Sequence, residues 1–462
     1  MAKGHSKEPV AGKTTSNRKL RRLAHQESEL PTKPRPRKLP EVDRSDNDDL
    51  DGGYSTDNTF SHSGDDDCDD CDTSISSLGV GSVSLLESEE PPVNNLNDCI
   101  ASIQEFKRAN NPKNIAERTK TLTKYAQILR AFYFGREISS TFPAIRRTLL
   151  RLITSPGNLD EQLLALKCLG LTMLSCATAG VYDEVQQTLK RICQDDATRP
   201  DVKSLALVVL GVAVVFGYAG DEDRSEVLEF LTEAIESDGS TLEATDSGSV
   251  VATALRVWGF VACQYRDLEE IAVQAMDAFI DQLDSTDIDV ESRAAFNIAL
   301  VFEASRNAAE QHGKAFNIRQ DPKDIVKELK GLAQQSKNVV GRKNGREVAT
   351  RLGDVIVGLE LGYGPNYSTA GRPLQNPHTG VGKGGFLDPR DFKEFGYRDK
   401  VIDKDGEVTF TVTTWAESVK IKILRTLLLR DAYVATHLEE NPELREELFP
   451  EDDEDDDDED DD

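Results

Sequence analysis

The order of apolar and polar residues along the chain predicts a long series of α-helices. Between residues 97 and 337, apolar side chains recur every three to four positions, the spacing that places them on one face of a helix. The stretch 121–134, for example, aligns Leu122, Tyr125, Leu129 and Phe132. Short breaks separate such stretches, so the pattern predicts helices that follow one another closely along the chain.

The predicted helices also recur in pairs. The first helix of each pair begins near Ser140, Val181, Asp221 and Asp267. The second begins near Asn158, Pro200, Gly248 and Asp287. Successive pairs lie roughly 40 to 46 residues apart, which is typical of armadillo and HEAT arrays. The pattern therefore predicts an all-α, armadillo/HEAT-like α-solenoid over residues 95–340, with a compact helical bundle as the alternative.

Within each pair, the two helices differ in their apolar surface. One is amphipathic, whereas the next is apolar nearly all round, as in residues 205–216. In a solenoid the second helix of a pair is packed on more than one side, so this alternation favours stacked pairs. Asn158 is expected to cap one such helix, because its side chain can accept a hydrogen bond from a first-turn amide.

The composition changes after the repeats. A basic helix is predicted over residues 341–361, and a Gly/Pro-rich loop follows over 362–387. A small α+β module is expected over 388–450. It should contain a strand in which Val408, Phe410 and Val412 alternate with threonines, and a helix that opens at Trp415. Asn441 should cap the last helix, in which Pro442 takes the first position.

The two ends of the chain are polar and charged. Residues 1–92 predict a disordered leader that is basic at first and then acidic, and residues 451–462 an acidic tail. The net charge of −28 comes largely from the acidic runs 41–72 and 451–462. The leader holds two basic clusters that suit nuclear import or contact with RNA phosphates, or else form a solvated tail. These clusters are Arg18, Lys19, Arg21, Arg22, Lys33, Arg35, Arg37 and Lys38.

A third basic cluster consists of Arg342, Lys343, Arg346 and Arg351. These cations precede an apolar stripe that includes Val348, and they suit either phosphate contacts or a solvated helix face.

Several short motifs resemble chemical sites without completing them. Cys68 and Cys71 have metal-like spacing but no second pair or nearby histidine. The glycines and lysine of 380–385 lack the other residues of a phosphate-binding loop. Residues 403–406 are expected to form a turn and not a calcium loop, because valines occupy the ligand positions that flank it. We therefore expect no enzyme, no cofactor, no metal and no small-molecule substrate.

The cysteine pattern and the apolar runs bear on the compartment. The seven cysteines are odd in number, and several lie among apolar residues, which favours a reducing environment. The sequence has no apolar run long enough to span a membrane, and its start lacks a secretory core. We expect a soluble protein of the cytoplasm and nucleus, with no membrane partner.

Several segments, in their order and spacing, resemble the interferon-related developmental regulator family. They are residues 160–166, 290–295, 300–306, 342–355, 413–415 and 437–441. The positions in the last two that carry the resemblance are Trp415, His437, Leu438 and Asn441. The resemblance implies an armadillo-like fold without catalytic activity, and association with ribosomes in translational control, or transcriptional co-regulation. The Gly/Pro-rich insert and the acidic end of the chain depart from the family pattern.

These observations lead to three functional hypotheses. The first is a regulator that binds the ribosome or rRNA through its basic clusters, with protein partners on the solenoid surface. The second is a nuclear scaffold that recruits transcriptional regulators through the concave face of the solenoid. The third is an acidic chaperone or adaptor of ribosomal proteins.

Overall fold

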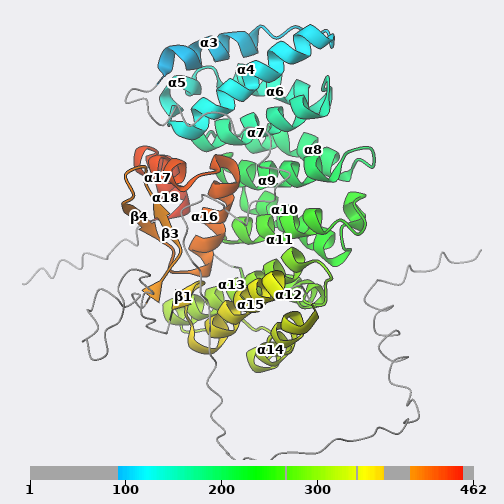
Figure 1. Cartoon of the computed structure of the whole chain (residues 1–462), viewed down its shortest axis with the longest axis vertical. Coiled ribbons are helices and arrows are strands. Elements are labelled where there is room, and N and C mark those ends of the chain that lie inside the picture. The colour runs from blue at the N-terminus through cyan, green and yellow to red at the C-terminus, as the bar shows by residue number, and fades with distance from the viewer. Residues whose placement is uncertain (1–91, 266–267, 340–341, 369–395, 451–462) are drawn as a thin grey trace, which may run out of the picture. The chain divides into compact units, whose positions relative to one another are not determined.

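The computed structural model describes residues 92–265, 268–339, 342–368 and 396–450. Most of these residues are helical (Figure 1). The helices of the repeat region are α3 (Val93–Gln104), α4 (Pro112–Ala131), α5 (Gly135–Ser139), α6 (Phe142–Thr154), α7 (Leu159–Ser175), α8 (Val181–Gln194), α9 (Pro200–Phe216), α10 (Asp221–Glu236), the short 3-10 helix η2 (Ser240–Leu242), α11 (Gly248–Ala262), α12 (Glu269–Gln282), α13 (Ile288–His312), α14 (Pro322–Val339) and α15 (Arg342–Leu361).

Helices of the repeat region pack as antiparallel pairs, of which α8 with α9 and α10 with α11 are examples. The second helices of the pairs, α4, α7, α9, α11, α13 and α15, lie side by side as one continuous layer (Figure 1). The first helices, including α6, α8, α10 and α12, form the layer beside it. The predicted α-solenoid is confirmed, and each of the eight predicted helix starts lies within two residues of an observed start.

Local sequence signals explain where several helices begin. The Asn158 side chain accepts a hydrogen bond of 2.8 Å from the Glu161 amide, which confirms the predicted cap of α7. Helix α4 begins at Pro112, well before the predicted stretch 121–134, because Asn111 caps it and proline suits the first position. It ends at Ala131, so Phe132 lies just beyond the helix and is only partly buried.

The described part of the C-terminal region contains two small antiparallel two-stranded sheets and three helices. Strand β1 (Tyr367–Ser368) pairs with β2 (Gly396–Tyr397), and β3 (Lys400–Ile402) pairs with β4 (Val408–Thr411). The helices are α16 (Trp415–Leu428), α17 (Asp431–Glu440) and α18 (Pro442–Leu448). We refer to β3, β4 and α16–α18 as the C-terminal module. Asn441 caps α18 as predicted, accepting a hydrogen bond of 3.2 Å from the Leu444 amide.

Two details differ from the expectation for this region. The Gly/Pro-rich segment contains the short strand β1, which is held in place because the Tyr367 ring lies 4.1 Å from that of Tyr363 and 5.0 Å from that of Tyr397. Residues 369–387 of that segment lie outside the described ranges. In β4, Val408 is exposed beside the turn, whereas Val412 after the strand is fully buried. Residues 403–406 form the expected turn, in which the Asp403 carboxylate accepts the Asp405 and Glu407 amides.

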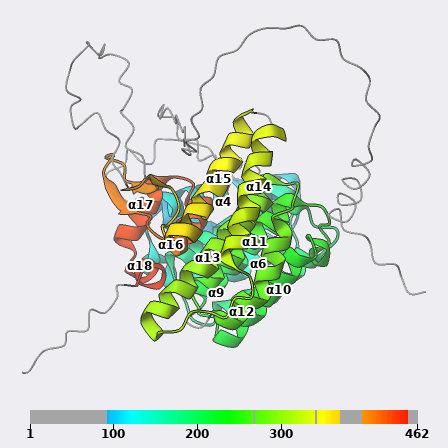
Figure 2. The ribbon, with the colours of Figure 1, turned by 90° about the horizontal axis from the view of Figure 1, so that it is seen from below.

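The C-terminal module covers the layer of second helices. Helix α16 contacts α4, α7, α11 and α13, on the side of that layer opposite α10 and α12 (Figures 1 and 2). The second helices that α16 contacts are thus packed from both sides, and in α11 every residue from Val250 to Ala262 is buried. The apolar surface all round these helices therefore reflects coverage by the chain's own C-terminal module as well as by neighbouring repeats.

Candidate interaction surfaces

Side chains of the C-terminal module and of the solenoid form hydrogen bonds with backbone groups at each other's helix ends. At the start of α16, the Glu303 carboxylate from α13 accepts hydrogen bonds from the Trp415 and Ala416 amides at 2.9 and 3.0 Å. At its end, Arg130 Nε from α4 donates to the Leu427 carbonyl at 3.0 Å. A carboxylate at the amino end and a guanidinium at the carboxyl end both oppose the helix dipole. These two residues therefore fix α16 along its axis.

The reverse caps come from the module. The His437 Nε2 atom lies 2.9 Å from the Leu129 carbonyl and 3.2 Å from the Arg130 carbonyl, both in the last turn of α4. The Asn441 Nδ2 group donates to the Leu174 carbonyl, in the last turn of α7, at 3.0 Å. The last carbonyls of a helix have no partner within it, so these side chains stabilise the carboxyl ends of two solenoid helices.

All four positions that carry the C-terminal resemblance are therefore buried. Trp415, His437 and Asn441 are at most 1% exposed, and Leu438 is 9% exposed. The Trp415 ring also donates to the Tyr363 carbonyl at 3.2 Å and packs against Phe296. In this structure these residues join the module to the solenoid, and their side chains are not presented to a partner.

Burial changes the protonation of this interface. It lowers the pKa of His437 to about 4, although the carbonyl contacts act in the opposite direction. Burial also raises the pKa of Glu303, against the effect of the two amides that it accepts. The structure thus favours a neutral His437, with Nε2–H facing the two carbonyls.

Three further buried ionisable groups of the described residues, Lys167, Glu291 and Asp354, lie on separate helices. Burial lowers the pKa of Lys167 on α7 to about 8 and raises those of Glu291 on α13 and Asp354 on α15 to about 7 and 6. No group of three metal-ligating side chains occurs within the described ranges. None of the helices searched there is both long and apolar enough to cross a membrane.

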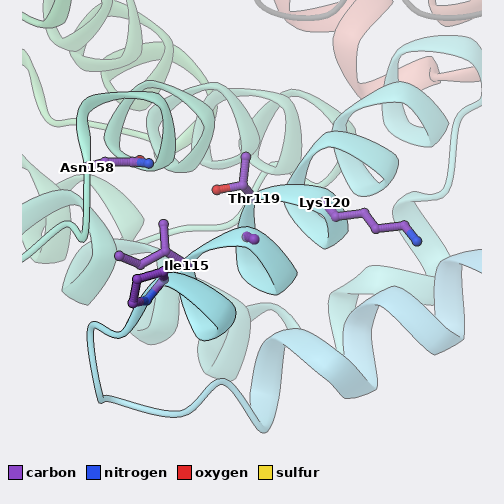
Figure 3. Close-up of a pocket in the computed structure, with 6 residues that line it drawn as sticks. Ile115, Thr119, Lys120 and Asn158 are labelled. Carbon is purple, nitrogen blue, oxygen red and sulfur yellow. The ribbon is translucent and has the colours of Figure 1, made fainter.

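Two open pockets lie on the described surface. One, of about 530 Å³, is lined by α4 and the start of α7 (Figure 3). Lys120 is the charged residue that lines it, and its side chain extends away from Ile115 and Asn158. Asn158 is already used as the cap of α7. A second pocket, of about 490 Å³, is lined mainly by charged residues of α14 together with Asp284.

The predicted basic contacts have different outcomes. The eight leader residues lie outside the described ranges, and so do the side chains of Arg342, Lys343 and Arg346. Arg351 is described, and its guanidinium pairs with Asp289 at 3.1 Å and with Glu347 at 2.6 Å. Its side chain is 18% exposed. Arg351 therefore links α15 to the start of α13.

Charge is strongly segregated along the solenoid. Residues 93–155, which span α3 to α6, contain eleven Lys and Arg residues but four Asp and Glu residues. Residues 156–312 contain ten Lys and Arg residues and 28 Asp and Glu residues. The first repeats of this acidic chain thus carry a net positive charge, while the following repeats are strongly acidic.

Exposed cations of the first repeats also lack ion-pair partners among the described residues. These are Lys107, Arg108, Lys113, Lys120, Arg136 and Arg147. Further along the chain, Lys190 pairs with Glu226, and Lys314 with Glu269. This basic region was not among the basic clusters expected from the sequence, although a net charge summed over windows of about 60 residues reveals it.

The comparison with known families agrees with the fold. A family model described as "Interferon-related developmental regulator (IFRD)" matches residues 65–360, which is more than half of the chain. The chain belongs to the interferon-related developmental regulator family. This family is known for regulators and not for enzymes. The match ends within α15, so the C-terminal module, with Trp415 and His437, lies beyond the matched segment.

A fission yeast protein shares this sequence pattern. The protein named "Uncharacterized protein C20F10.03" of Schizosaccharomyces pombe is 23% identical over 306 residues. The similarity covers 62% of this chain and 67% of the yeast protein. Its printed name gives no activity.

Proposed function

We propose that this member of the interferon-related developmental regulator family is a non-catalytic protein that associates with ribosomes and thereby controls translation. The observation that carries the proposal is the positive charge of the first repeats in a chain whose net charge is −28. The net negative charge of the whole protein repels RNA. A locally basic surface therefore determines where RNA can approach.

The arrangement of the solenoid supports a binding role. The C-terminal module occupies the layer that a solenoid commonly uses for partners, because α16 contacts four of its helices. Macromolecules would therefore meet the outer helices and the two ends of the repeat array. Buried Lys167, Glu291 and Asp354 lie on three separate helices, so these three groups do not form one reaction centre.

Sedimentation tests the proposal. The full chain is mixed with salt-washed ribosomes from fission yeast and centrifuged through sucrose gradients at low and high potassium chloride. We expect co-sedimentation at low salt and steep loss at high salt, because phosphate contacts release counterions. A protein that remains at the top of the low-salt gradient would refute ribosome association. An unrelated protein of similar net charge controls for trapping.

The scaffold alternative requires a different surface from the one first expected. Because the C-terminal module covers the layer of second helices, a nuclear partner would have to bind the outer helices, such as α10 or α12. A fluorescent fusion that is excluded from the nucleus in all conditions would end this alternative. The chaperone alternative predicts that ribosomal proteins are retained by the full chain and lost when residues 451–462 are removed.

A further inference from the structure

We propose that Lys107, Arg108, Lys113 and Arg147 form one surface at the amino-terminal end of the solenoid that binds the phosphate backbone of RNA. We call these four residues the basic patch. The inference deepens the proposed function, since it assigns the RNA contact to the first two helix pairs. It differs from the sequence-based expectation, which placed such contacts in the leader and around Arg342.

The loop that carries Lys107 and Arg108 is anchored by the buried side chain of Arg118. Arg118 is 2% exposed and forms a two-bond ion pair with Glu161 of α7, at 2.5 and 3.1 Å. Its Nη1 group donates to the carbonyls of Lys107 and Ala109 at 2.9 and 3.2 Å, and its Nη2 group also donates to Asn110 Oδ1 at 3.0 Å. The backbone of residues 107–109 is thereby anchored to the solenoid. A positioned loop loses less conformational entropy when it binds a ligand.

The same loop is joined to the start of α4 and to α6. Asn114 Nδ2 donates to the Ala109 carbonyl at 3.0 Å, which brings the first turn of α4, with Lys113, beside the loop. Arg151 of α6 donates to the Phe106 carbonyl at 3.3 Å. Arg147 lies one turn before Arg151 on the same helix face. Two helices and one loop thus contribute cations to the basic patch.

Electrostatic interactions place Arg108, in the loop before α4, near Arg151 of α6. Burial lowers the pKa of Arg151, and the nearby charges of Arg108 and Arg118 lower it further. The exposed acids nearest in sequence, Glu105 and Glu117, form no ion pair with a described cation. The positive charge of the basic patch is therefore uncompensated by described side chains, and an added anion would relieve the repulsion.

The chemistry of the surroundings favours nucleic acid over a protein partner. Val93 is the one large hydrophobic residue of described α3 to α6 that is exposed. Protein interfaces usually need a buried apolar centre, whereas contacts to nucleic acid are mainly hydrogen bonds and ion pairs to phosphates. Two arginines can each bind phosphate oxygens in a bidentate manner. An RNA backbone fits this set of side chains better than a folded protein surface.

Charge reversal at matched sites tests the inference. The patch variant combines Lys107→Glu, Arg108→Glu and Arg147→Glu in the full chain. The control variant combines Arg191→Glu, Lys323→Glu and Lys404→Glu, which are also exposed cations and lie in α8, α14 and the β3–β4 turn. Both variants change the net charge by the same amount. Circular dichroism melting verifies that both remain folded.

Binding is measured by fluorescence anisotropy with a labelled 20-base-pair RNA duplex, and by co-sedimentation with yeast ribosomes. For the patch variant we expect the RNA affinity to fall roughly 10- to 100-fold and the salt dependence to weaken by about one unit of slope per lost contact. The control variant should stay within a factor of about three of the original chain. Equal losses in both variants would overturn the assignment of the basic patch.

The two assays separate the two proposals. If the original chain binds ribosomes and the patch variant binds them equally well, the basic patch is refuted while ribosome association stands. If the original chain binds the duplex through the patch but not the ribosome, ribosome association is refuted alone. A synthetic peptide of residues 451–462 serves as an acidic competitor. If it binds the patch more tightly than RNA does, the patch recognises an acidic segment and the RNA assignment is overturned.

Discussion

Replacing His437 with glutamine tests how the C-terminal module is joined to the solenoid. Glutamine keeps an N–H donor that can face the Leu129 and Arg130 carbonyls, but it cannot take up a proton. Because burial lowers the pKa of His437 to about 4, the unfolded chain, with a pKa near 6.5, binds a proton more readily than the folded chain. The stability contributed by the neutral ring is therefore present above the unfolded pKa and is lost as the pH falls toward the folded one.

The expected size follows from this difference in pKa. Between about pH 7.5 and about pH 5.0, protonation in the unfolded state should lower the free energy of unfolding by about 2 kcal/mol. Buried Glu291 and Asp354 act in the opposite direction, since their raised pKa values of about 7 and 6 favour the folded state as the pH falls. A comparison of the original chain with the glutamine variant cancels these other contributions.

Urea unfolding, followed by circular dichroism and by tryptophan fluorescence, measures the effect at the two pH values. The original chain should lose about 2 kcal/mol more than His437→Gln does on acidification. At neutral pH the two proteins should differ by about 1 kcal/mol or less, because one hydrogen bond is replaced by another. If the free energy of unfolding depends on pH identically in both proteins, His437 is not buried as a neutral ring. The packing of the C-terminal module on the solenoid described above would then be wrong.

Three further substitutions probe other contacts. Arg118→Met leaves the Glu161 carboxylate buried without its partner, and should lower the free energy of unfolding by about 3 kcal/mol in guanidinium titrations. Glu303→Gln removes the negative charge at the start of α16 and should lower the stability of this helix by about 1 kcal/mol. Faster hydrogen exchange of the α16 amides measures this loss. Glu291→Gln should be more stable than the original chain above pH 7, because its carboxyl must ionise while buried, and the difference should vanish at about pH 4.5.

Each of these has a matched control or a clear contrary result. Arg199→Met removes a cation that is 65% exposed, and should change the stability by less than about 0.5 kcal/mol. Unchanged exchange rates in α16 after Glu303→Gln would mean that its amides do not depend on that carboxylate. A pH-independent gain from Glu291→Gln would point to packing and not to ionisation.

The position of the C-terminal module on the solenoid limits which surfaces remain for recognition of other macromolecules. The chain's own helices occupy the face that the scaffold hypothesis assigned to partners, and they do so through caps exchanged in both directions. The surfaces left for other macromolecules are the outer helices, which are acidic around α10, and the basic patch at the amino-terminal end. A protein built this way can present opposite charges to different partners at the same time.

Much of the fold was predictable because its signals are local. The 3.6-residue spacing of apolar side chains depends only on neighbours along one helix, and Asn158, Pro200 and Asn441 mark helix starts through contacts within a few residues. The charge segregation was equally present in the sequence, although only a count by segment reveals it. The solenoid and most of its boundaries follow from such short-range information.

The tertiary structure alone decided what covers the second helices. His437 meets Leu129 across 308 positions of the chain, and Glu303 meets Trp415 across 112. The sequence does not predict which distant backbone group a histidine or glutamate will bind. Such a hydrogen bond forms only when two surfaces pack together. For the same reason, the buried ion pair of Arg118 with Glu161, which fixes the side chain that anchors the loop of Lys107, was visible only after α4 and α7 had been brought side by side.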